Sequence, residues 1–195
     1  LSHDEAHLLL DILKGKSQET YEMALLSLQC GLRAGEVFSL TWKDVDLDHG
    51  FVTLLDTKSG KTRTVSMTAD VKVFLMEKDK GGKQDLIFPD RKTCGIRKQI
   101  SKSFPRAVIE AGLNEGIDDR RQRVTFHTLR HTFASWLVME GISLYDIKEF
   151  LGHATLTMTE RYAHLAPDRN KKAAATMEKV FQKKTDAESN VVNMN

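Results

Sequence analysis

Cysteine, proline and long apolar runs are all scarce in this chain of 195 residues. The two cysteines, Cys30 and Cys94, are too few for a disulfide framework, and neither stands at a metal-ligand spacing. They indicate free thiols in a reducing compartment. No apolar run reaches the roughly 18 residues that a membrane-spanning helix needs, and no signal-peptide pattern is present. The sequence therefore excludes a disulfide-rich scaffold and predicts no membrane span.

The remaining composition fits one globular domain. Hydrophobic residues make up 41% of the chain and charged residues 29%, which is ordinary for a soluble domain. A chain of 195 residues can bury a core without disulfides, so we expect one domain or slightly more. The chain begins with Leu1 rather than Met. We therefore expect a fragment of a longer protein, whose N-terminal part and any targeting signal are missing.

The net charge of +2 is small, but its distribution is uneven. Residues 91–130 contain ten Lys and Arg residues and four acidic ones, a local excess of six positive charges. Such a patch is often only a solvated face. Beside residues suited to phosphate chemistry, it is also a candidate surface for the backbone of a nucleic acid.

Apolar periodicity predicts more helix than strand. Ser2 and Glu5 form a capping-box pattern at the start of the first predicted helix, which we expect to end at Gly15. Ser143 is the predicted cap of a later helix, and Thr155 or Thr157 of a short one leading to Tyr162. The predicted helices cover residues 2–14, 18–30, 35–40, 69–79, 96–111 with a break or kink near Pro105, 127–140, 144–151 and, as a basic helix, about 168–184.

The pattern changes between residues 45 and 67, where alternation predicts about three short antiparallel strands. Lys58 and Lys61 lie at or near the tip of the hairpin, where Gly60 permits a tight turn. The expected fold is therefore mostly α with a small antiparallel β-sheet, an α+β class.

Several residues in these elements suit the cleavage of a phosphodiester. That reaction needs positive charge around the phosphate and a proton for the leaving oxygen. Arg33 and Arg130 are candidates for the first task, because a guanidinium matches two phosphate oxygens. Glu36 could orient Arg33, or could be an ordinary acid in the first turn of a helix. Lys58 could protonate the leaving oxygen, and Lys61 could compete for that role.

Histidines and a tyrosine complete the candidate set. His127 and Arg130 share a face near a helix start, where free N–H groups favour a phosphate. His127 and His131 stand at a spacing that could hold zinc, but no third ligand is evident. His153 follows Gly152 at a helix end, where a histidine is often only a cap. Tyr162 could act as a nucleophile if cationic groups surround it, because its phenol is scarcely ionised at neutral pH. Tyr21 and Tyr145 lie in apolar helical patterns and are predicted to pack.

Four segments in order resemble the catalytic domain of the tyrosine recombinases, the phage-integrase family. They are GLRAGE around Arg33, TKSGKTRTVSM around Lys58, HTLRHTFAS around Arg130 and LGHATLTMTERYAHL ending near Tyr162. The resemblance runs from about residue 2 to 166. Ser66 stands where many relatives have Pro, a departure that we expect to be harmless.

The resemblance implies an enzyme whose Tyr162 attacks DNA to form a 3′-phosphotyrosyl link, without metal, cofactor or ATP. Arg33 and Arg130 would clamp the phosphate, Lys58 would be the general acid, and His127 and His153 would assist. It implies a catalytic domain over residues 1–166 and a C-terminal basic helix and tail over 167–195 that could dock on a neighbouring protomer. From the same resemblance we expect that the N-terminal core-DNA-binding domain of the family is absent from this fragment.

The resemblance also implies partners and a location. The partners would be double-stranded DNA, further copies of the chain in a tetramer, and accessory DNA-bending proteins. A bacterial or phage-encoded enzyme of this kind would work in the cytoplasm, at the nucleoid. Two alternatives stay open: a type IB topoisomerase, which would relax supercoils as a monomer, and a DNA-binding module without catalysis, against which Tyr162 and both arginines argue.

Overall fold

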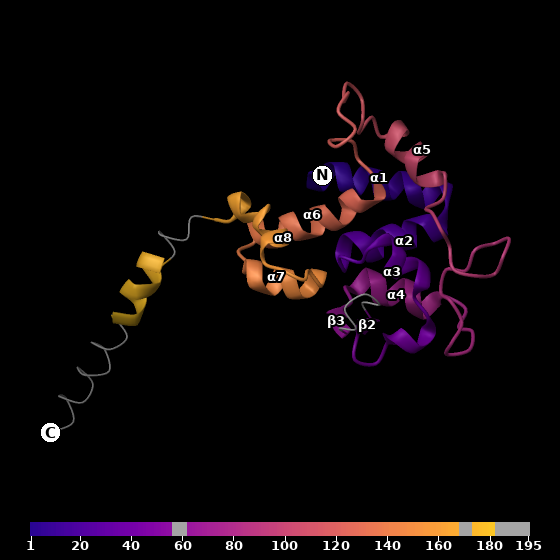
Figure 1. The fold of residues 1–195 in the computed structure, drawn as a ribbon, viewed down its shortest axis with the longest axis horizontal. Helices are drawn as coiled ribbons and strands as arrows, with labels where there is room; N and C mark the ends of the chain where they lie inside the picture. Colours follow the sequence, from indigo (N-terminus) through magenta and orange to yellow (C-terminus); the bar gives the residue numbers. More distant parts are fainter. Residues whose placement is uncertain (56–61, 168–172, 182–195) are drawn as a thin grey trace.

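The computed structural model describes residues 1–55, 62–167 and 173–181. It confirms the mostly helical fold with one small sheet (Figure 1). Residues 173–181 are also helical, within the predicted C-terminal helix, and their side chains are exposed. Within the described ranges, no helix has the length and apolar character to cross a membrane. The elements, with η for 3₁₀-helices, are α1 His3–Lys16, α2 Gln18–Gln29, α3 Ala34–Ser39, η1 Trp42–Asp44, α4 Ala69–Glu77, α5 Ser103–Glu110, α6 Phe126–Met139, α7 Leu144–Leu151, α8 Thr157–Glu160 and η2 Ala163–Leu165.

Three strands form the predicted antiparallel sheet, in the order β1 Val45–Asp46, β2 Phe51–Leu55 and β3 Thr62–Ser66. Val52 of β2 lies opposite Val65 of β3. Both side chains are buried, because alternation along each strand turns one face toward the helices. Lys58 and Lys61, predicted near the hairpin tip, lie outside the described residues.

Helix α2 is the centre of the main core. It packs against α1, α4 and α6 (Figure 1). Most of its residues are buried, including Met23, Leu25 and Leu26, because neighbouring elements cover several of its faces. The core therefore holds the start of α3, directly after α2, in a fixed place.

A second, smaller core lies between the later helices. It contains Ala134 and Val138 of α6, Ile147 and Leu151 of α7, and Tyr162. Helix α6 contributes residues to both cores, since Leu129 belongs to the larger one. This helix therefore connects the two parts of the fold, and the candidate residues His127 and Arg130 lie along it.

Several predicted helix boundaries are confirmed. Ser2 and Glu5 make the predicted capping box, and the side chain of Ser143 accepts a hydrogen bond from the backbone of Asp146. The end of α1 was predicted wrongly: the helix continues past Gly15 to Lys16, and the backbone N–H of Ser17 bonds to the carbonyl of Leu13. The predicted caps Thr155 and Thr157 are also wrong, since α8 starts after Leu156 with no side-chain cap.

The helix predicted over residues 96–111 is shorter in the structure and covers only Ser103–Glu110. Pro105 lies in its first turn, where a backbone N–H has no partner within the helix, so this proline breaks nothing. The preceding segment follows another path, because Arg97 donates to the carbonyls of Phe88 and Pro89 and pairs with Glu19. Contacts distant in sequence therefore override the local helical pattern.

Candidate active site

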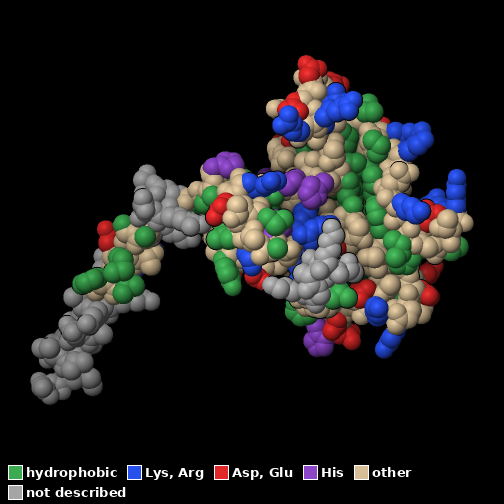
Figure 2. Space-filling model, viewed as in Figure 1, with side chains coloured by type: hydrophobic (Ala, Val, Ile, Leu, Met, Phe, Trp, Pro, Cys, Tyr) green, Lys and Arg blue, Asp and Glu red, His purple; other side chains and the backbone are tan. Residues whose placement is uncertain are grey.

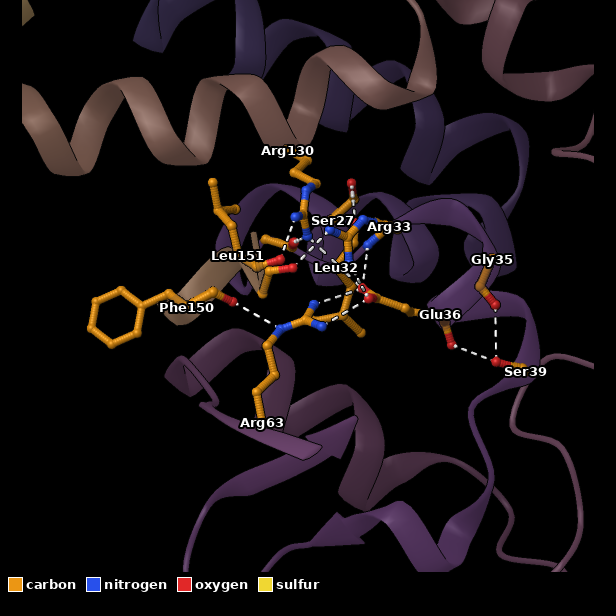
Figure 3. A network of polar contacts seen from close by, with 12 residues as sticks. Ser27, Leu32, Arg33, Gly35, Glu36, Ser39, Arg63, Arg130, Phe150 and Leu151 are labelled. Carbon is orange, nitrogen blue, oxygen red and sulfur yellow. Dashed lines mark hydrogen bonds and ion pairs between the residues drawn. The ribbon is translucent and has the colours of Figure 1, made fainter. Parts of the chain in front are cut away.

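A single carboxylate, that of Glu36, joins the segments of the candidate site (Figure 3). Arg33 precedes α3, and its backbone N–H donates to Glu36 Oε2 at 2.7 Å. The Arg33 side chain donates from Nη1 to Glu36 Oε1 at 2.8 Å. Glu36 therefore caps the short helix and also orients Arg33, so it has both of the roles that the sequence predicted as alternatives.

Arg63 of β3 reaches the same carboxylate with both of its terminal nitrogens. Its Nη1 and Nη2 lie 2.8 and 2.7 Å from the two oxygens of Glu36, and its Nε donates to the carbonyl of Phe150 at 3.0 Å. Burial would raise the pKa of Glu36, but bonds and charges from Arg63, and then from Arg33, outweigh it and lower the pKa. The carboxylate is therefore ionised at neutral pH and offsets the surrounding guanidinium charges.

Arg130 is the most deeply buried cation of the site, with 2% of its surface exposed. Its guanidinium donates to the carbonyls of Gly31 and Leu151, and its Nη1 lies 3.9 Å from Glu36. Burial, followed by the charge of Arg33, lowers the pKa of Arg130 to about 9. That value is above neutral pH, so the guanidinium remains charged.

Two helix ends supply the carbonyls that hold the arginines. Arg130 bonds to Gly31 after α2 and to Leu151 at the end of α7, while Arg33 donates to Gly152 at 3.1 Å. Gly152 has a φ of +61°, which favours glycine. A Cβ on it would stand 2.9 Å from Nη1 of Arg63. The end of α7 therefore allows Arg63 to approach this closely only because residue 152 is glycine.

His127 and His153 lie in the positive field of these arginines. His127 is exposed at the start of α6. Its pKa is lowered because neighbouring protein atoms displace part of the water around its ring, and because the positive charges of Arg130, Arg33 and Arg161 disfavour its protonated form. Burial and the same three arginines lower the pKa of His153 to about 4. Nδ1 of His153 lies 2.9 Å from Oγ1 of buried Thr159. That contact fixes the His153 ring and ties it to the helix three residues before Tyr162.

Tyr162 lies at the end of the site, with its ring in the smaller core and 6% of its surface exposed. Its hydroxyl is 2.5 Å from Nδ1 of His131. Burial raises the pKa of Tyr162, although Arg161 and Arg130 act in the opposite direction. The phenol is therefore protonated at rest, and its oxygen lies in the field of a buried guanidinium.

The structure thus places five of the six candidate residues around one site, namely Arg33, His127, Arg130, His153 and Tyr162. Lys58, the sixth, lies outside the described residues. Tyr21 is partly buried against the larger core, as predicted, but Tyr145 is 64% exposed, so its predicted packing role is wrong. Tyr145 lies on the outer face of α7, where the helix turns Ile147 and Leu151 inward instead.

Sequence reasoning missed two residues of the site. The sequence did not predict Arg63 as a site residue. It stands two residues before the buried Val65, however, and therefore on the inward face of β3. His131 was weighed as a zinc ligand with His127, whose ring lies 4.5 Å from its own, centroid to centroid. Its Nδ1 contacts Tyr162 instead, and no cluster of three or more His, Cys, Asp or Glu able to hold a metal exists in the described part of the chain.

The distribution of basic side chains on the surface also fits a site that binds phosphate. Histidine side chains lie beside Lys or Arg side chains near the middle of the face in Figure 2. Of the ten basic residues counted between positions 91 and 130, eight are exposed, while Arg130 is in the site and Arg97 pairs with Glu19. A buried arginine and a half-buried one, with exposed basic residues beyond them, suit a polyanion whose phosphate reaches the site.

Comparison with known proteins places these features in a family. The phage integrase family profile matches residues 1–169. Tyrosine recombinase XerA of Saccharolobus solfataricus is 34% identical over 73% of this chain and 45% of its own, and tyrosine recombinase XerC of Xanthomonas campestris pv. campestris is 32% identical over 85% and 51%.

Solved structures agree. The catalytic domain of bacteriophage HP1 integrase superposes with a TM-score of 0.70 at 29% identity, covering 90% of this chain and 92% of that domain. The XerH recombinase in a post-cleavage complex with its difH substrate gives 0.69 at 27% identity, over 91% of this chain and 53% of that one. The chain spans about half the length of the curated relatives it matches. It belongs to the phage integrase family of tyrosine recombinases, with the fold of their catalytic domain.

Proposed function

We propose that this chain is the catalytic part of a site-specific DNA recombinase, which cleaves and rejoins DNA through a 3′-phosphotyrosyl intermediate at Tyr162. One observation carries the proposal. A buried tyrosine hydroxyl, held by a histidine, lies in the field of Arg130, which converges with Arg33 and Arg63 on one carboxylate. A phosphate drawn to these guanidinium groups would come close to the phenol oxygen.

The two arginines have distinct tasks in this reaction. Arg33 keeps 33% of its side chain exposed and can turn its fork toward the non-bridging oxygens of a phosphate. Arg130 is held by two backbone carbonyls, so its positive charge has a fixed position in the site. Such a preorganised charge stabilises the transition state without rearrangement during the reaction.

His127 and His153 bind the phosphate and assist proton transfer. His127 is exposed beside the start of α6, where free backbone N–H groups also favour an anion. The ring of His153 is fixed by Thr159. Lys58 is the proposed general acid for the 5′ oxygen. In this scheme neither metal, cofactor nor ATP takes part, because the phosphotyrosyl bond keeps the energy of the broken linkage.

The proposed substrate is double-stranded DNA, bound by further copies of the chain in a tetramer with help from accessory DNA-bending proteins. XerH has been solved with its DNA, and the exposed basic residues between positions 91 and 130 provide a surface for a DNA backbone here. The segment 167–195 would dock on a neighbouring protomer. Its described helix exposes Met177, Val180 and Phe181, apolar side chains that a neighbour could cover. The site of action would be the nucleoid in the cytoplasm.

A trapping experiment tests the proposal. The probe is a pool of DNA duplexes with random sequence and one 5′-bridging phosphorothiolate, whose thiolate leaving group does not reseal the strand. The chain should form a covalent protein–DNA adduct that survives denaturation, and Tyr162→Phe should bind DNA without forming it. The control is Tyr145→Phe, at an exposed tyrosine on α7, which should react normally. An adduct of equal yield with Tyr162→Phe would refute the nucleophile.

A further inference from the structure

The hydroxyl of Tyr162 already has a defined partner before DNA binds. Nδ1 of His131 lies 2.5 Å from it, across 31 residues of sequence. His131 is anchored in α6 directly after the buried Arg130, so a rigid helix sets its position. Building on the proposed function, we propose that His131 is the base that removes the phenolic proton from Tyr162 as it attacks DNA.

The protonation state of His131 suits this role. Burial, followed by the charges of His127, Arg161 and Arg130, lowers its pKa to about 4. The ring is therefore neutral at physiological pH, with one nitrogen that carries a lone pair. Because the hydroxyl of Tyr162 is a donor, the contact is satisfied when Nδ1 is that nitrogen and Nε2 carries the hydrogen.

The same environment keeps the proton on the phenol until DNA arrives. Burial raises the pKa of Tyr162, and positive charge from Arg161 and Arg130 weakens His131 as a base. A DNA phosphate beside Arg130 would offset that positive charge, so the pKa of His131 would rise toward its ordinary 6.5. Proton transfer is thereby coupled to substrate binding.

The O–H bond of Tyr162 breaks and its proton passes to the lone pair on Nδ1 of His131, giving an imidazolium. The phenol oxygen forms a bond to phosphorus, and the bond from phosphorus to the 5′ oxygen breaks. That oxygen takes a proton from the general acid, while a 5′ sulfur leaves as a thiolate without one. In rejoining, His131 returns its proton to the phenol oxygen.

The other two histidines, His127 and His153, have different neighbours. Nδ1 of His153 is engaged by Thr159 at 2.9 Å. His127 lies one turn before His131, exposed and in the field of Arg33 and Arg130. Both are therefore suited to the phosphate, while the geometry assigns the phenolic proton to His131.

Single-turnover rates of adduct formation on the phosphorothiolate pool test this assignment, because that substrate needs no general acid. His131→Ala and His131→Asn should react about 10²-fold or more slowly than the unmodified chain at neutral pH. Asparagine can still accept a hydrogen bond from the phenol but cannot take its proton, so it separates holding the ring from acting as a base. The control is His7→Ala, at an exposed histidine of α1.

The pH dependence gives a second readout. With the unmodified chain, the rate should fall in acid with an apparent pKa between about 4 and 6.5, the lowered and ordinary values for His131. The groups that face this ring are His127 and Arg130 on α6 and Arg161 and Tyr162 after α8. In both variants that acid limb should disappear, and added imidazole should partly restore the rate of His131→Ala.

Near-normal rates in both variants would overturn the proposal, as would slow rates with the acid limb retained and no rescue by imidazole. Far-UV circular dichroism and thermal melting identify a variant that has not folded, and His131→Asn then decides. An unmodified chain that forms no Tyr162-dependent adduct would instead contradict the proposed function, so the two failures are distinguishable.

Discussion

Arg63 and Glu36 form a two-pronged ion pair, with both terminal nitrogens of Arg63 within 2.8 Å of a carboxylate oxygen. The pair joins the sheet to the segment that carries Arg33. Only 11% of the Arg63 side chain and 14% of the Glu36 side chain are exposed, so water screens the pair little. The positions of Arg33 and Arg130, the arginines proposed to hold the phosphate, therefore depend on a carboxylate that is not expected to touch the DNA.

Replacing Glu36 should lower stability. In Glu36→Gln three guanidinium groups lose their shared counter-charge, and breaking such a buried pair costs about 3–5 kcal/mol. Urea unfolding at neutral pH measures this loss. Glu77→Gln, at an exposed carboxylate at the end of α4, should change stability by less than about 0.5 kcal/mol. An equally small change in Glu36→Gln would contradict the role given to this carboxylate.

The same carboxylate should give stability a pH dependence of known sign. The pKa of Glu36 is lowered in the folded state, so the unfolded state binds more protons in acid. Its contribution is fully present above the ordinary value of 4.5 and is lost as pH falls through the lowered folded value. Glu36→Gln should therefore lose less stability than the unmodified chain over that acid range.

Gly152→Ala should disturb the site more than its backbone angle explains. Gly152 and Gly50 both have positive φ, +61° and +74°, so alanine at either position should cost about 1–2 kcal/mol. Only at Gly152 would the new Cβ meet Arg63, whereas nothing lies within 4 Å at Gly50. We expect Gly152→Ala to be the less stable variant and to form the DNA adduct more slowly. Equal stability and equal rates would contradict the close approach.

Arg130→Lys should slow adduct formation by about 10²–10³-fold, comparable to the loss of one donor to a developing anion. A lysine ammonium cannot reproduce the fork that holds the Gly31 and Leu151 carbonyls while facing a phosphate. Lys43→Arg, at an exposed residue of η1 outside the basic surface of residues 91–130, is the control. A rate within threefold of the control would remove Arg130 from the reaction centre.

Lys58→Ala should react slowly with ordinary DNA and at a near-normal rate with the 5′-phosphorothiolate, because a thiolate leaves without a proton. Lys61→Ala tests the neighbouring lysine on both substrates. The ratio of the two rates for each variant is the measurement. If sulfur rescues Lys61→Ala and not Lys58→Ala, the general acid is Lys61.

Local patterns predicted the fold well where the cause was local. The capping box of Ser2 and Glu5, the end of α7 at Gly152 and the alternation in β2 and β3 each depend on residues close in sequence. The helix predicted over residues 96–111 was too long at its start, because the path of the residues before Ser103 depends on Arg97 and its distant partner Glu19. Such long-range contacts leave no periodic signal.

The same division applies to the candidate site. Arg33, Arg130 and Tyr162 could be selected because their residue types suit phosphate chemistry and their segments resemble a known family. Arg63 and His131 contact Glu36 and Tyr162, which lie 27 and 31 residues away in the sequence and which no local pattern specifies. The i, i+4 spacing of His127 and His131 did show that they share a helix face, but not what that face would meet.

Peptide mapping of the trapped adduct tests the central claim most directly. After protease and nuclease digestion, mass spectrometry should find the remaining nucleotide on the peptide that contains Tyr162, joined through the phenol oxygen. A nucleotide attached to Tyr145, to a serine or to any other residue would contradict the account.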